Sequence, residues 1–352
     1  MADAPDLGSG VTDVWVRVPS RVPELEKYNR RNFVMAIKTV ITEKEFRKGE
    51  AIFRAAADFE FIPAPEEESS LADAIRTHQA KHAVVGIVPY REELYQALPP
   101  GGVIARFGVG YDSIDLAKVR QYHLHCTNTP GTLEASVAEL SIGLLIAVMR
   151  SISTTAAALK AGVWHNSVGN EISGKRLLIV GCGAIGRKLA QMAKYGFNMT
   201  ILGCGNAPEN PAPELFDEYS MDFAALAPSA DVVSLHIPNR PENRNWMDEH
   251  RLALLQPGAV LLNTARGVVL DEAALYRALA SGALAGAGLD VFCEEPYCPV
   301  DPAMDLRTLD NVVMTPHLGG STGETCRRVA RKILENLRFA ERGEFHKMNN
   351  VE

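Results

Sequence analysis

The sequence predicts an α/β protein with two doubly wound domains, each built on a parallel β-sheet. Short apolar segments alternate with helical segments in two separate series, one from residue 32 and one from residue 176. Such alternation is typical of a parallel sheet that helices cover on both faces. The chain has 352 residues, which is enough for two domains of ordinary size.

The first series contains about five expected strands. Helical spacing marks the segments 42–57 and 66–79 between them. Residues 1–31 come before the series, and we interpret them as an extension because they are polar, proline-containing and without clear periodicity. The strands are expected at residues 33–40, 59–62, 83–88, 103–107 and 124–128.

A long helical stretch, residues 133–160, separates the two series. Its segment 136–149 is apolar almost all round, so we expect it to be buried inside the protein or against a partner. The second series of strands and helices runs from Arg176 to about Pro316, and an amphipathic, basic helix is expected over residues 322–341.

Composition and charge exclude several classes of partner. Hydrophobic residues make up 47% and charged residues 22% of the chain, as in soluble globular proteins, and the net charge is -7. An acidic chain has no electrostatic reason to bind nucleic acid or an anionic membrane. Residues 1–10 lack the pattern of a signal peptide and the apolar stretch 140–149 is too short to span a bilayer, so we expect a cytoplasmic protein.

The six cysteines form no CxxC pair and have no histidine at the spacing of a metal site. We therefore expect free thiols in a reducing compartment and no bound metal. These cysteines are Cys126, Cys182, Cys204, Cys293, Cys298 and Cys326.

The strongest local motif is a GxGxxG turn that follows an apolar strand and opens a helix. Gly181 permits the tight turn, Gly183 lets a pyrophosphate approach the backbone, and Gly186 lets the helix and strand pack closely. The pyrophosphate of a dinucleotide would bind the free N–H groups at the helix N-terminus. The motif is Gly181-Cys182-Gly183-Ala184-Ile185-Gly186.

The next strand should end on an acidic residue that binds the adenosine ribose hydroxyls. Cys204 occupies this place instead. No Arg or Lys occurs between Gly203 and Phe216 to bind the 2′-phosphate of NADP. Because a phosphate without a nearby cation binds poorly, we favour NAD, and NADP stays open.

Three polar segments follow apolar runs of the second series. The carboxyl ends of parallel strands face the ligand crevice, so these residues are candidates for chemistry rather than packing. Arg266 offers a planar, bidentate donor for a substrate carboxylate. His317 is suited to transfer a proton at a carbonyl oxygen, and Glu295 would orient it and keep it protonated.

These segments together make the chain recognisable. It resembles the D-isomer-specific 2-hydroxyacid dehydrogenase family over nearly all of residues 80–340. The resemblance rests on the glycine turn, the three polar segments, the separation of 29 positions from Arg266 to Glu295, and the segments 106–115, 128–131 and 137–139. It implies a Rossmann coenzyme domain, residues 131–317, inserted in a flavodoxin-like substrate domain, residues 32–130 and 318–352.

The resemblance also implies roles for individual residues. Glu295 is favoured over Glu294 because the family places its carboxylate directly before a proline. The substrate carboxylate would bind the backbone of the loop 87–90, that of Gly110, and Arg266, and the helix from Ser136 would form much of a homodimer interface. Cofactor contacts are implied at Gly181, Cys182, Gly183, Ala184, Ile185, Gly186, Cys204, His236, Ile237, Pro238, Thr264, Ala265, Asp290, His317, Gly319 and Gly320, and substrate contacts at Val88, Pro89, Tyr90, Val109, Gly110 and Arg266.

The sequence therefore predicts hydride transfer between NAD(P)H and a 2-oxo acid, the product being a D-2-hydroxy acid. A phosphite dehydrogenase on the same frame stays an alternative, whereas Glu295 argues against a formate dehydrogenase, which has Gln beside the histidine. An NAD-binding corepressor or scaffold is a further alternative, because corepressors of this family keep the same three residues. The identity of the acid stays open, and it depends on the loop 87–91 and on residues near Trp164 and Tyr297.

Overall fold

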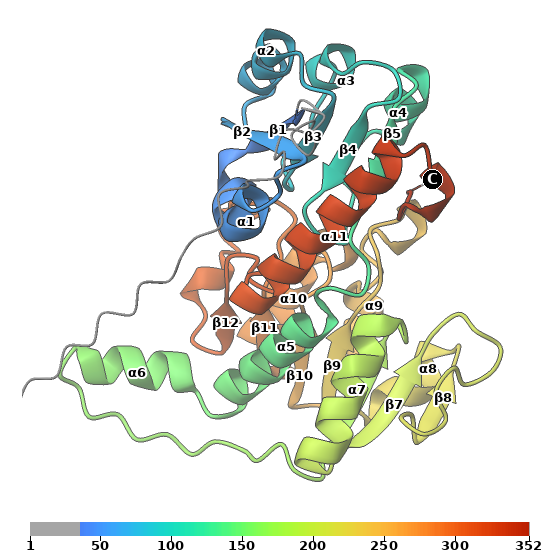
Figure 1. Ribbon diagram of the computed structural model, residues 1–352. Coiled ribbons are helices and arrows are strands. Elements are labelled where there is room, and N and C mark those ends of the chain that lie inside the picture. The colour runs from blue at the N-terminus through green and yellow to red at the C-terminus, as the bar shows by residue number, and fades with distance from the viewer. Residues whose placement is uncertain (1–35, 352) are drawn as a thin grey trace, which may run out of the picture. The chain divides into compact units, whose positions relative to one another are not determined.

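The structure is a computed structural model that describes residues 36–351, and Ala36–Glu352 cluster as one compact unit. The expected extension 1–31 and residues 33–35 of the first expected strand lie outside the described residues. The described chain contains two parallel sheets with helices on both faces of each (Figure 1). The predicted α/β fold class with two doubly wound sheets is thereby confirmed.

The first sheet has five parallel strands in the order β2-β1-β3-β4-β5, which is the order of flavodoxin-like sheets. One face packs against α1 and α11, through a core that includes Ile41, Phe53 and Ile333. The other face packs against α2, α3 and α4. The elements are β1 Ile37–Thr42, α1 Glu43–Arg54, β2 Phe59–Ala64, α2 Glu68–His78, β3 His82–Val85, α3 Glu93–Ala97, β4 Val103–Arg106, α4 Leu116–Gln121, β5 His125–Thr127 and α11 Gly323–Glu341.

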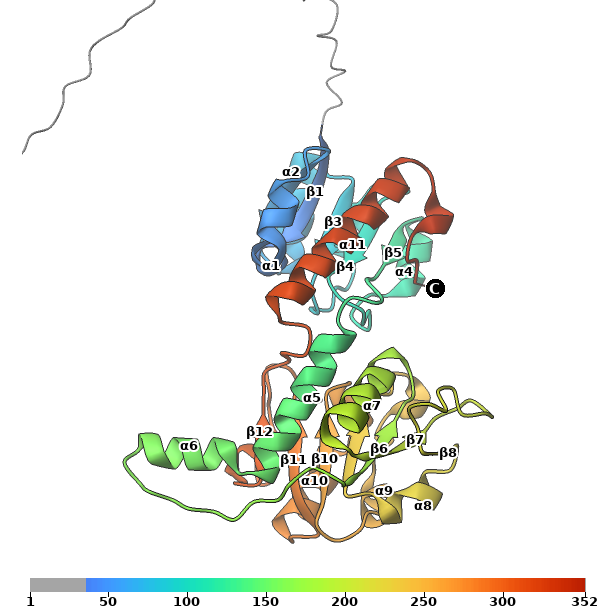
Figure 2. The ribbon, with the colours of Figure 1, turned by 60° about the horizontal axis from the view of Figure 1, so that its bottom comes forward.

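The second sheet has seven parallel strands in the order β12-β11-β10-β9-β6-β7-β8. The order reverses beside β6, and ligands of such sheets bind at this switch point. Helices α5 and α7 lie side by side on one face (Figure 2), and the other face packs against α10. The elements are α5 Glu134–Met149, α6 Ile152–Lys160, β6 Arg176–Val180, α7 Ala184–Phe197, β7 Thr200–Cys204, β8 Glu218–Ser220, α8 Phe223–Leu226, β9 Val232–Leu235, α9 Glu249–Ala253, β10 Ala259–Asn263, α10 Glu272–Ala280, β11 Leu284–Leu289 and β12 Val312–Met314.

Two expectations about the elements were wrong in detail. The first strand, expected over 33–40, is β1, Ile37–Thr42, and its residues Val40 and Ile41 are fully buried. The helical stretch 133–160 is two helices, α5 and α6, whose axes differ by 66°. Ser151 between them has a φ of 49°, and this left-handed conformation ends a right-handed helix. No glycine or proline marks the break, so the periodicity alone did not predict it.

Helix α5 is buried on one face only. Ala138, Ile142 and Leu145 pack against the second sheet, whereas Glu139 and Gly143 are exposed. Helix α6 has no buried residue at all. Within one chain, the expected burial is therefore met only on the inner face of α5. The outer face of α5 is not covered by other described residues.

All six cysteines are free thiols, and among them only Cys298 is exposed. Within residues 36–351, no single helix is long and apolar enough to cross a membrane. The bent pair of α5 and α6 passes the same test of length and composition when its two helices are taken together.

Candidate active site

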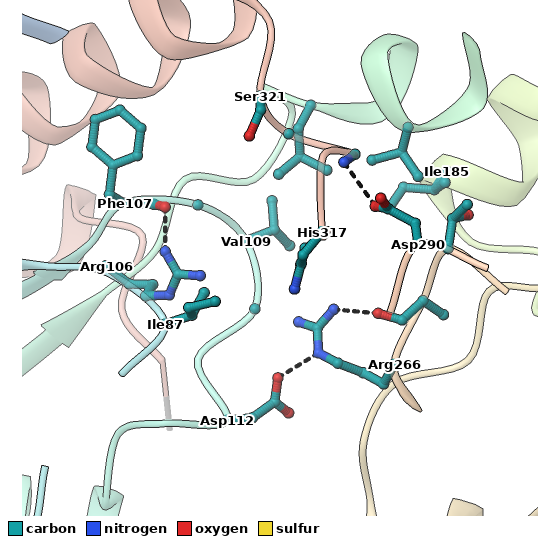
Figure 3. Close-up of a pocket in the computed structure, with 18 of the residues that line it drawn as sticks. Ile87, Arg106, Phe107, Val109, Asp112, Ile185, Arg266, Asp290, His317 and Ser321 are labelled. Atoms are coloured by element: carbon teal, nitrogen blue, oxygen red, sulfur yellow. Dashed lines mark hydrogen bonds and ion pairs between the residues drawn. The ribbon is translucent and has the colours of Figure 1, made fainter. Parts of the chain in front are cut away.

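A cavity of about 520 Å³ opens where the carboxyl ends of strands from both sheets meet (Figure 3). Most of the predicted site residues that follow strands of the second sheet line it, together with residues of the β4 loop. The predicted residues on its wall are Val109, Gly110, Ile185, His236, Ile237, Pro238, Thr264, Ala265, Arg266, Asp290, His317, Gly319 and Gly320.

His317 lies directly after β12 and Pro316 and lines this cavity. Its Nδ1 is 2.6 Å from Oε2 of Glu295, and its Nε2 has no hydrogen-bond partner among residues 36–351. The backbone φ of His317 is 55°, and its N–H donates to the carbonyl oxygen of Asp290 at 2.9 Å. A left-handed φ in a non-glycine residue has to be held by its surroundings, so the β11 loop fixes where this imidazole points.

Glu295 lies in the loop after β11 and does not itself reach the cavity wall. Its Oε1 accepts the N–H of Phe292 at 3.1 Å while its Oε2 faces His317. Partial burial acts to raise the pKa of the Glu295 carboxyl, but the hydrogen bond and charge of His317 outweigh it, and the pKa lies below its ordinary value. The pair is therefore built with an ionised carboxylate behind the imidazole.

Asp290 holds the loop that carries His317. Its carboxylate is buried and accepts the hydroxyl of Thr315 at 2.6 Å, the N–H of Leu318 at 2.7 Å and the N–H of Gly319 at 2.8 Å. These bonds use most of the acceptor capacity of the carboxylate. Asp290 lines the cavity as predicted, and the structure adds this second task of positioning the loop 315–319.

Arg266 lies after β10 and reaches across to the first sheet. Its Nε donates to Oδ2 of Asp112 at 2.7 Å, and its Nη1 donates to the carbonyl oxygen of Ala265 at 2.6 Å. A Cβ on Gly110 would lie 1.6 Å from Nη2 of Arg266, so only glycine fits under the guanidinium. Nη2 has no hydrogen-bond partner among the described residues and is available to a ligand at the cavity.

The glycine turn connects β6 to α7 with the geometry that its three glycines predict. Gly181 has a φ of 100°, and a Cβ on Gly186 would lie 2.3 Å from the carbonyl oxygen of Gly181. A Cβ on Gly183 would meet nothing within 4 Å, so the space that this glycine leaves is open to a ligand. The turn lies at the switch point of the second sheet.

The N-terminus of α7 fits the pyrophosphate of a dinucleotide. It has neither a capping side chain nor an acidic residue in its first turn, whereas Asp115, Asp222 and Asp271 cap other helices of the chain. The first N–H groups of a helix have no partner within the helix, and they carry a positive partial charge. This uncapped helix end is therefore suited to bind an anion.

His236 follows β9 on the same wall. Burial lowers its pKa to about 4, so the ring is neutral at physiological pH, and its Nε2 is 2.8 Å from Oγ of Ser234. Thr264 is held by the hydroxyl of Ser141 on α5 at 3.0 Å. The wall where the nicotinamide half would bind is thus uncharged on this side.

Cys204 does not occupy the place where a ribose-binding carboxylate would act. Its side chain is buried in the core with Leu202 and Phe223, and burial raises the pKa of its thiol to about 11. The thiol of Cys182 is partly buried on the other face of the sheet, and its pKa is raised to about 12. The predicted cofactor contact of the Cys204 side chain is therefore not supported by its position.

The predicted substrate loop, residues 87–90, meets the cavity at its first residue. Ile87 lines the cavity, whereas Val88, Pro89 and Tyr90 are not among its described lining residues. Tyr90 is 4% exposed and packs in the core of the first sheet. The resemblance implied backbone contacts for this loop, and the buried Tyr90 side chain does not test them. The strand β3 ends at Val85, earlier than the predicted strand end at 88.

Several cavity residues were not predicted. Asp112 and Arg106 lay within a segment used for the resemblance, and their place after β4, at a strand's carboxyl end, was an available signal. Lys44 and Lys48 line the cavity from α1, and nothing in the local pattern of that helix marks them. They reach the site only because α1 packs beside the β4 loop and α11.

Comparisons with known proteins agree with this geometry. The model of the D-isomer specific 2-hydroxyacid dehydrogenase family, NAD binding domain, matches residues 142–319. The glyoxylate reductase of Thermococcus litoralis is 39% identical over 262 residues, which are 72% of this chain and 78% of that protein. The hydroxypyruvate reductase of Thermotoga maritima is 40% identical over 244 residues, 68% of this chain and 78% of that protein.

A solved structure matches nearly the whole described chain. The NADPH-dependent glyoxylate/hydroxypyruvate reductase of Sinorhizobium meliloti, in complex with NADP and malonate, superimposes with a TM-score of 0.73 at 26% identity. The match covers 86% of this chain and 93% of that one. The fold on both sides of the cavity is therefore the fold of known nicotinamide-dependent reductases.

Proposed function

The chain belongs to the D-isomer specific 2-hydroxyacid dehydrogenase family, and we propose that it reduces a 2-oxo acid to a D-2-hydroxy acid with His317 as the proton donor. Its relatives make it an NAD(P)-dependent oxidoreductase of 2-hydroxy acids. The observation that supports the assignment of His317 is the different bonding of its two ring nitrogens. One nitrogen is bound to Glu295, and the other is unpartnered among the described residues in the cavity that Arg266 also lines.

The residues of the chain fit the steps of this reaction. When bound, the nicotinamide supplies a hydride to the carbonyl carbon of the oxo acid. His317 donates a proton from Nε2 to the carbonyl oxygen, and Glu295 stabilises the protonated imidazole before the transfer. Asp290 holds the loop of His317 in place through its bonds to Thr315, Leu318 and Gly319. In the oxidation direction His317 accepts the proton.

Arg266 binds the substrate carboxylate in this proposal. Its Nη2 is available, and Asp112 holds its Nε so that the guanidinium plane stays fixed over Gly110. Backbone N–H groups of Ile87 and Gly110 are the further donors that we assign to the carboxylate, because both residues line the cavity. The substrate-binding domain would be residues 32–130 with 318–352, and the cofactor-binding domain residues 131–317.

We assign NAD rather than NADP as the preferred cofactor. The uncapped N-terminus of α7 and the open space at Gly183 support binding of the pyrophosphate. After β7, the segment from Gly205 to Pro211 supplies no cation for a 2′-phosphate, and the Cys204 side chain is buried. A phosphate without a cationic partner gains little on binding.

The protein would act as a homodimer in the cytoplasm. The outer face of α5 is open, α6 has no buried residue, and the following segment exposes 87% of Trp164 and all of Val168. Exposed apolar side chains gathered on one segment are typical of an interface. The free thiols of the chain fit a reducing compartment. Sedimentation of the purified protein as a monomer would remove the dimer from the proposal.

The experiment that tests the function is oxidation of NADH and of NADPH by a panel of 2-oxo acids. Glyoxylate, hydroxypyruvate, pyruvate and phenylpyruvate cover small, polar and aromatic side chains. Turnover of at least one acid, faster with NADH than with NADPH, is the expected result. If the protein binds NADH but reduces none of the four acids, the reductase assignment is contradicted and a sensor or scaffold role is favoured.

A further inference from the structure

Four charged residues of the first-sheet half line the active-site cavity away from the predicted catalytic residues. Lys44, Glu45 and Lys48 come from α1, and Arg106 ends β4. Lys44 and Lys48 are four residues apart, so they lie on the same face of the helix. We refer to these four residues as the α1 cluster. The proposed reaction assigns no task to any of them.

The α1 cluster has an excess of positive charge. Its one carboxylate, Glu45, is buried and already satisfied, because it accepts the hydroxyl of Thr42 and Nζ of Lys48, the latter at 3.2 Å. Lys44 has no ion pair among residues 36–351. Three cations and one carboxylate leave a net charge of about +2 in a chain whose own net charge is -7. Acidic proteins place such local cations where an anion has to be drawn in.

The burial and hydrogen bonding of Arg106 are the strongest evidence that this cluster binds a ligand. It is only 7% exposed, its Nη1 donates to the carbonyl oxygen of Phe107, and its Nε is buried with no hydrogen-bond partner among the described residues. Burial lowers its pKa to about 10, which leaves the guanidinium charged at neutral pH. Nε is sealed from the cavity, but Nη2 has no hydrogen-bond partner among the described residues and is not fully buried, so it is the donor that an anion in the cavity would meet.

The α1 cluster is joined to the substrate loop. Nζ of Lys48 lies 5.7 Å from the centre of the Phe107 ring, and a Cβ on Gly86 would lie 2.8 Å from Oε1 of Glu45. Gly86 precedes Ile87, so only a glycine lets the loop pack so closely on the Glu45 carboxylate. The cluster and the loop therefore form one continuous wall.

The two ends of the cavity differ in their charged groups. Figure 3 shows Arg106, Phe107 and Ile87 at one side, His317 and Arg266 at the other, and Val109 between them. All of these residues line one cavity, so a substrate held by Arg266 and His317 has room to extend its remaining carbons past Val109 toward Arg106. The far end of such a substrate then meets the α1 cluster.

We propose that the α1 cluster binds a second anionic group at the far end of the substrate, so that the preferred substrate is a 2-oxo acid with two anionic groups. This inference rests on the proposed function, whose carboxylate and carbonyl contacts it extends. The second group is a carboxylate or a phosphate, since both accept hydrogen bonds from Lys and Arg. Lys44 and Lys48 supply the charge from α1, and Arg106 supplies a directed, buried donor.

The test compares substrates that have the second anionic group with counterparts that lack it. For a carboxylate the pair is 2-oxoglutarate and its terminal amide, 2-oxoglutaramate. For a phosphate the pair is 3-phosphohydroxypyruvate and hydroxypyruvate. The expected result is a kcat/KM about 10- to 100-fold higher for the member with the second anionic group in at least one pair, which is what one or two charge-assisted hydrogen bonds provide. The pair with the larger ratio identifies the anionic group.

Variants of α1 link this preference to the cluster. Lys44→Met and Lys48→Met should each lower the ratio of the two kcat/KM values by about 10-fold, whereas Lys48→Arg should retain it. Lys332→Met is the matched control, because Lys332 lies on α11 and pairs with Glu335. An unchanged ratio in both methionine variants would overturn the inference.

Two further outcomes separate this inference from the proposed function. Equal kcat/KM values within both pairs, with rapid reduction of glyoxylate or pyruvate, would overturn the preference for a second anionic group and leave the reductase intact. Arg106 would then share the single substrate carboxylate with Arg266. If no acid is reduced, calorimetry on the NADH-saturated protein still decides, because 2-oxoglutarate or 3-phosphohydroxypyruvate has to bind about 10-fold more tightly than the counterpart that lacks the second anionic group. Equal binding would overturn the inference independently of turnover.

Discussion

Two histidine–glutamate pairs of similar geometry lie in different parts of the molecule. Nδ1 of His317 is 2.6 Å from Glu295 at the cavity, and Nε2 of His82 is 2.8 Å from Glu341 between β3 and α11. The side chain of His317 is 30% exposed, whereas that of His82 is fully buried. In both pairs the pKa of the glutamate is lowered. Burial acts to raise the pKa of Glu295, but the effect of His317 outweighs burial. The hydrogen bond from His82 is the main cause of the lowered pKa of Glu341.

The pairs differ at the other nitrogen of each ring. Nδ1 of His82 accepts the N–H of Val103 at 3.0 Å, so both ring nitrogens are used and the ring is neutral, as its lowered pKa from burial also requires. His317 has its Nε2 without a partner among residues 36–351. The distance to a carboxylate therefore does not make a histidine an acid–base residue. A second nitrogen that faces a ligand cavity does.

Replacement of His317 should give the largest effect on catalysis. His317→Ala removes the proton donor, and kcat for oxo-acid reduction should fall about 10²- to 10⁴-fold. The melting temperature should change little, because the ring is partly exposed and packs in no core cluster. Steady-state kinetics and thermal unfolding of the same preparation measure both. Near-normal turnover would remove His317 from the mechanism.

Replacement of His82 should affect stability instead. His82→Ala leaves the N–H of Val103 and the Glu341 carboxylate without their partner and opens a cavity, so the free energy of unfolding should fall by about 2–4 kcal/mol. The kcat of the folded protein should stay within about twofold, since His82 does not line the cavity. Urea unfolding measures the loss, with the exposed His78→Ala as the control. A loss of kcat at full stability would contradict the division of roles between the pairs.

Replacement of Glu295 tests whether the carboxylate supports the imidazole. Glu295→Gln keeps a hydrogen bond but removes the negative charge that favours the protonated ring, so the pH profile of reduction should shift to lower pH by about one unit. Glu294→Gln, in the adjacent and exposed position, is the matched control. If the pH profile of reduction is the same in Glu295→Gln as in the wild-type protein, a group other than Glu295 favours the protonated ring of His317.

The grouping of the residues that we propose for catalysis could be predicted from the sequence because its determinants are local. His317, Asp290 and Arg266 follow β12, β11 and β10, which are adjacent strands of one parallel sheet. Each lies within a few residues of an apolar run, so a rule about the carboxyl ends of strands was enough to bring them together. The glycine turn was predicted for the same reason, and so was the α/β order of both sheets.

The features of the fold and the site that were not predicted depend on contacts between distant segments. His82 and Glu341 are 259 residues apart, and Lys44 reaches the cavity only through the packing of α1. No pattern along α1 distinguishes a lysine that faces a cavity from one that faces water. Element bounds also depend on such contacts: the strand expected over 83–88 ends at Val85, and the side chain of Tyr90 in the loop after it is buried in the core.

The pair of His82 and Glu341 should also show in the pH dependence of stability. The pKa of Glu341 falls from 4.5 to about 2, mainly through the bond from His82 and against the effect of its partial burial, with Lys81 adding to the shift. A lowered folded-state pKa contributes stability that is present above the unfolded value of 4.5 and is lost as the pH falls toward 2. The lowered pKa of His82 has the same sign, so it also weakens the protein below its unfolded value of 6.5.

Comparison of the wild-type protein with Glu341→Gln isolates the carboxylate from the other acidic groups. The wild-type protein should be more stable at pH 7, and its advantage should shrink by about 1 kcal/mol between pH 5 and pH 3.5, because the unfolded glutamate takes up a proton there and the folded one does not. Glu335→Gln, which removes an exposed partner of Lys332 on the same helix, should show no such change. Urea midpoints at four pH values between 7 and 3.5 measure the gap. A gap that stays constant down to pH 3.5 would mean that His82 is held by its bond to Val103 alone.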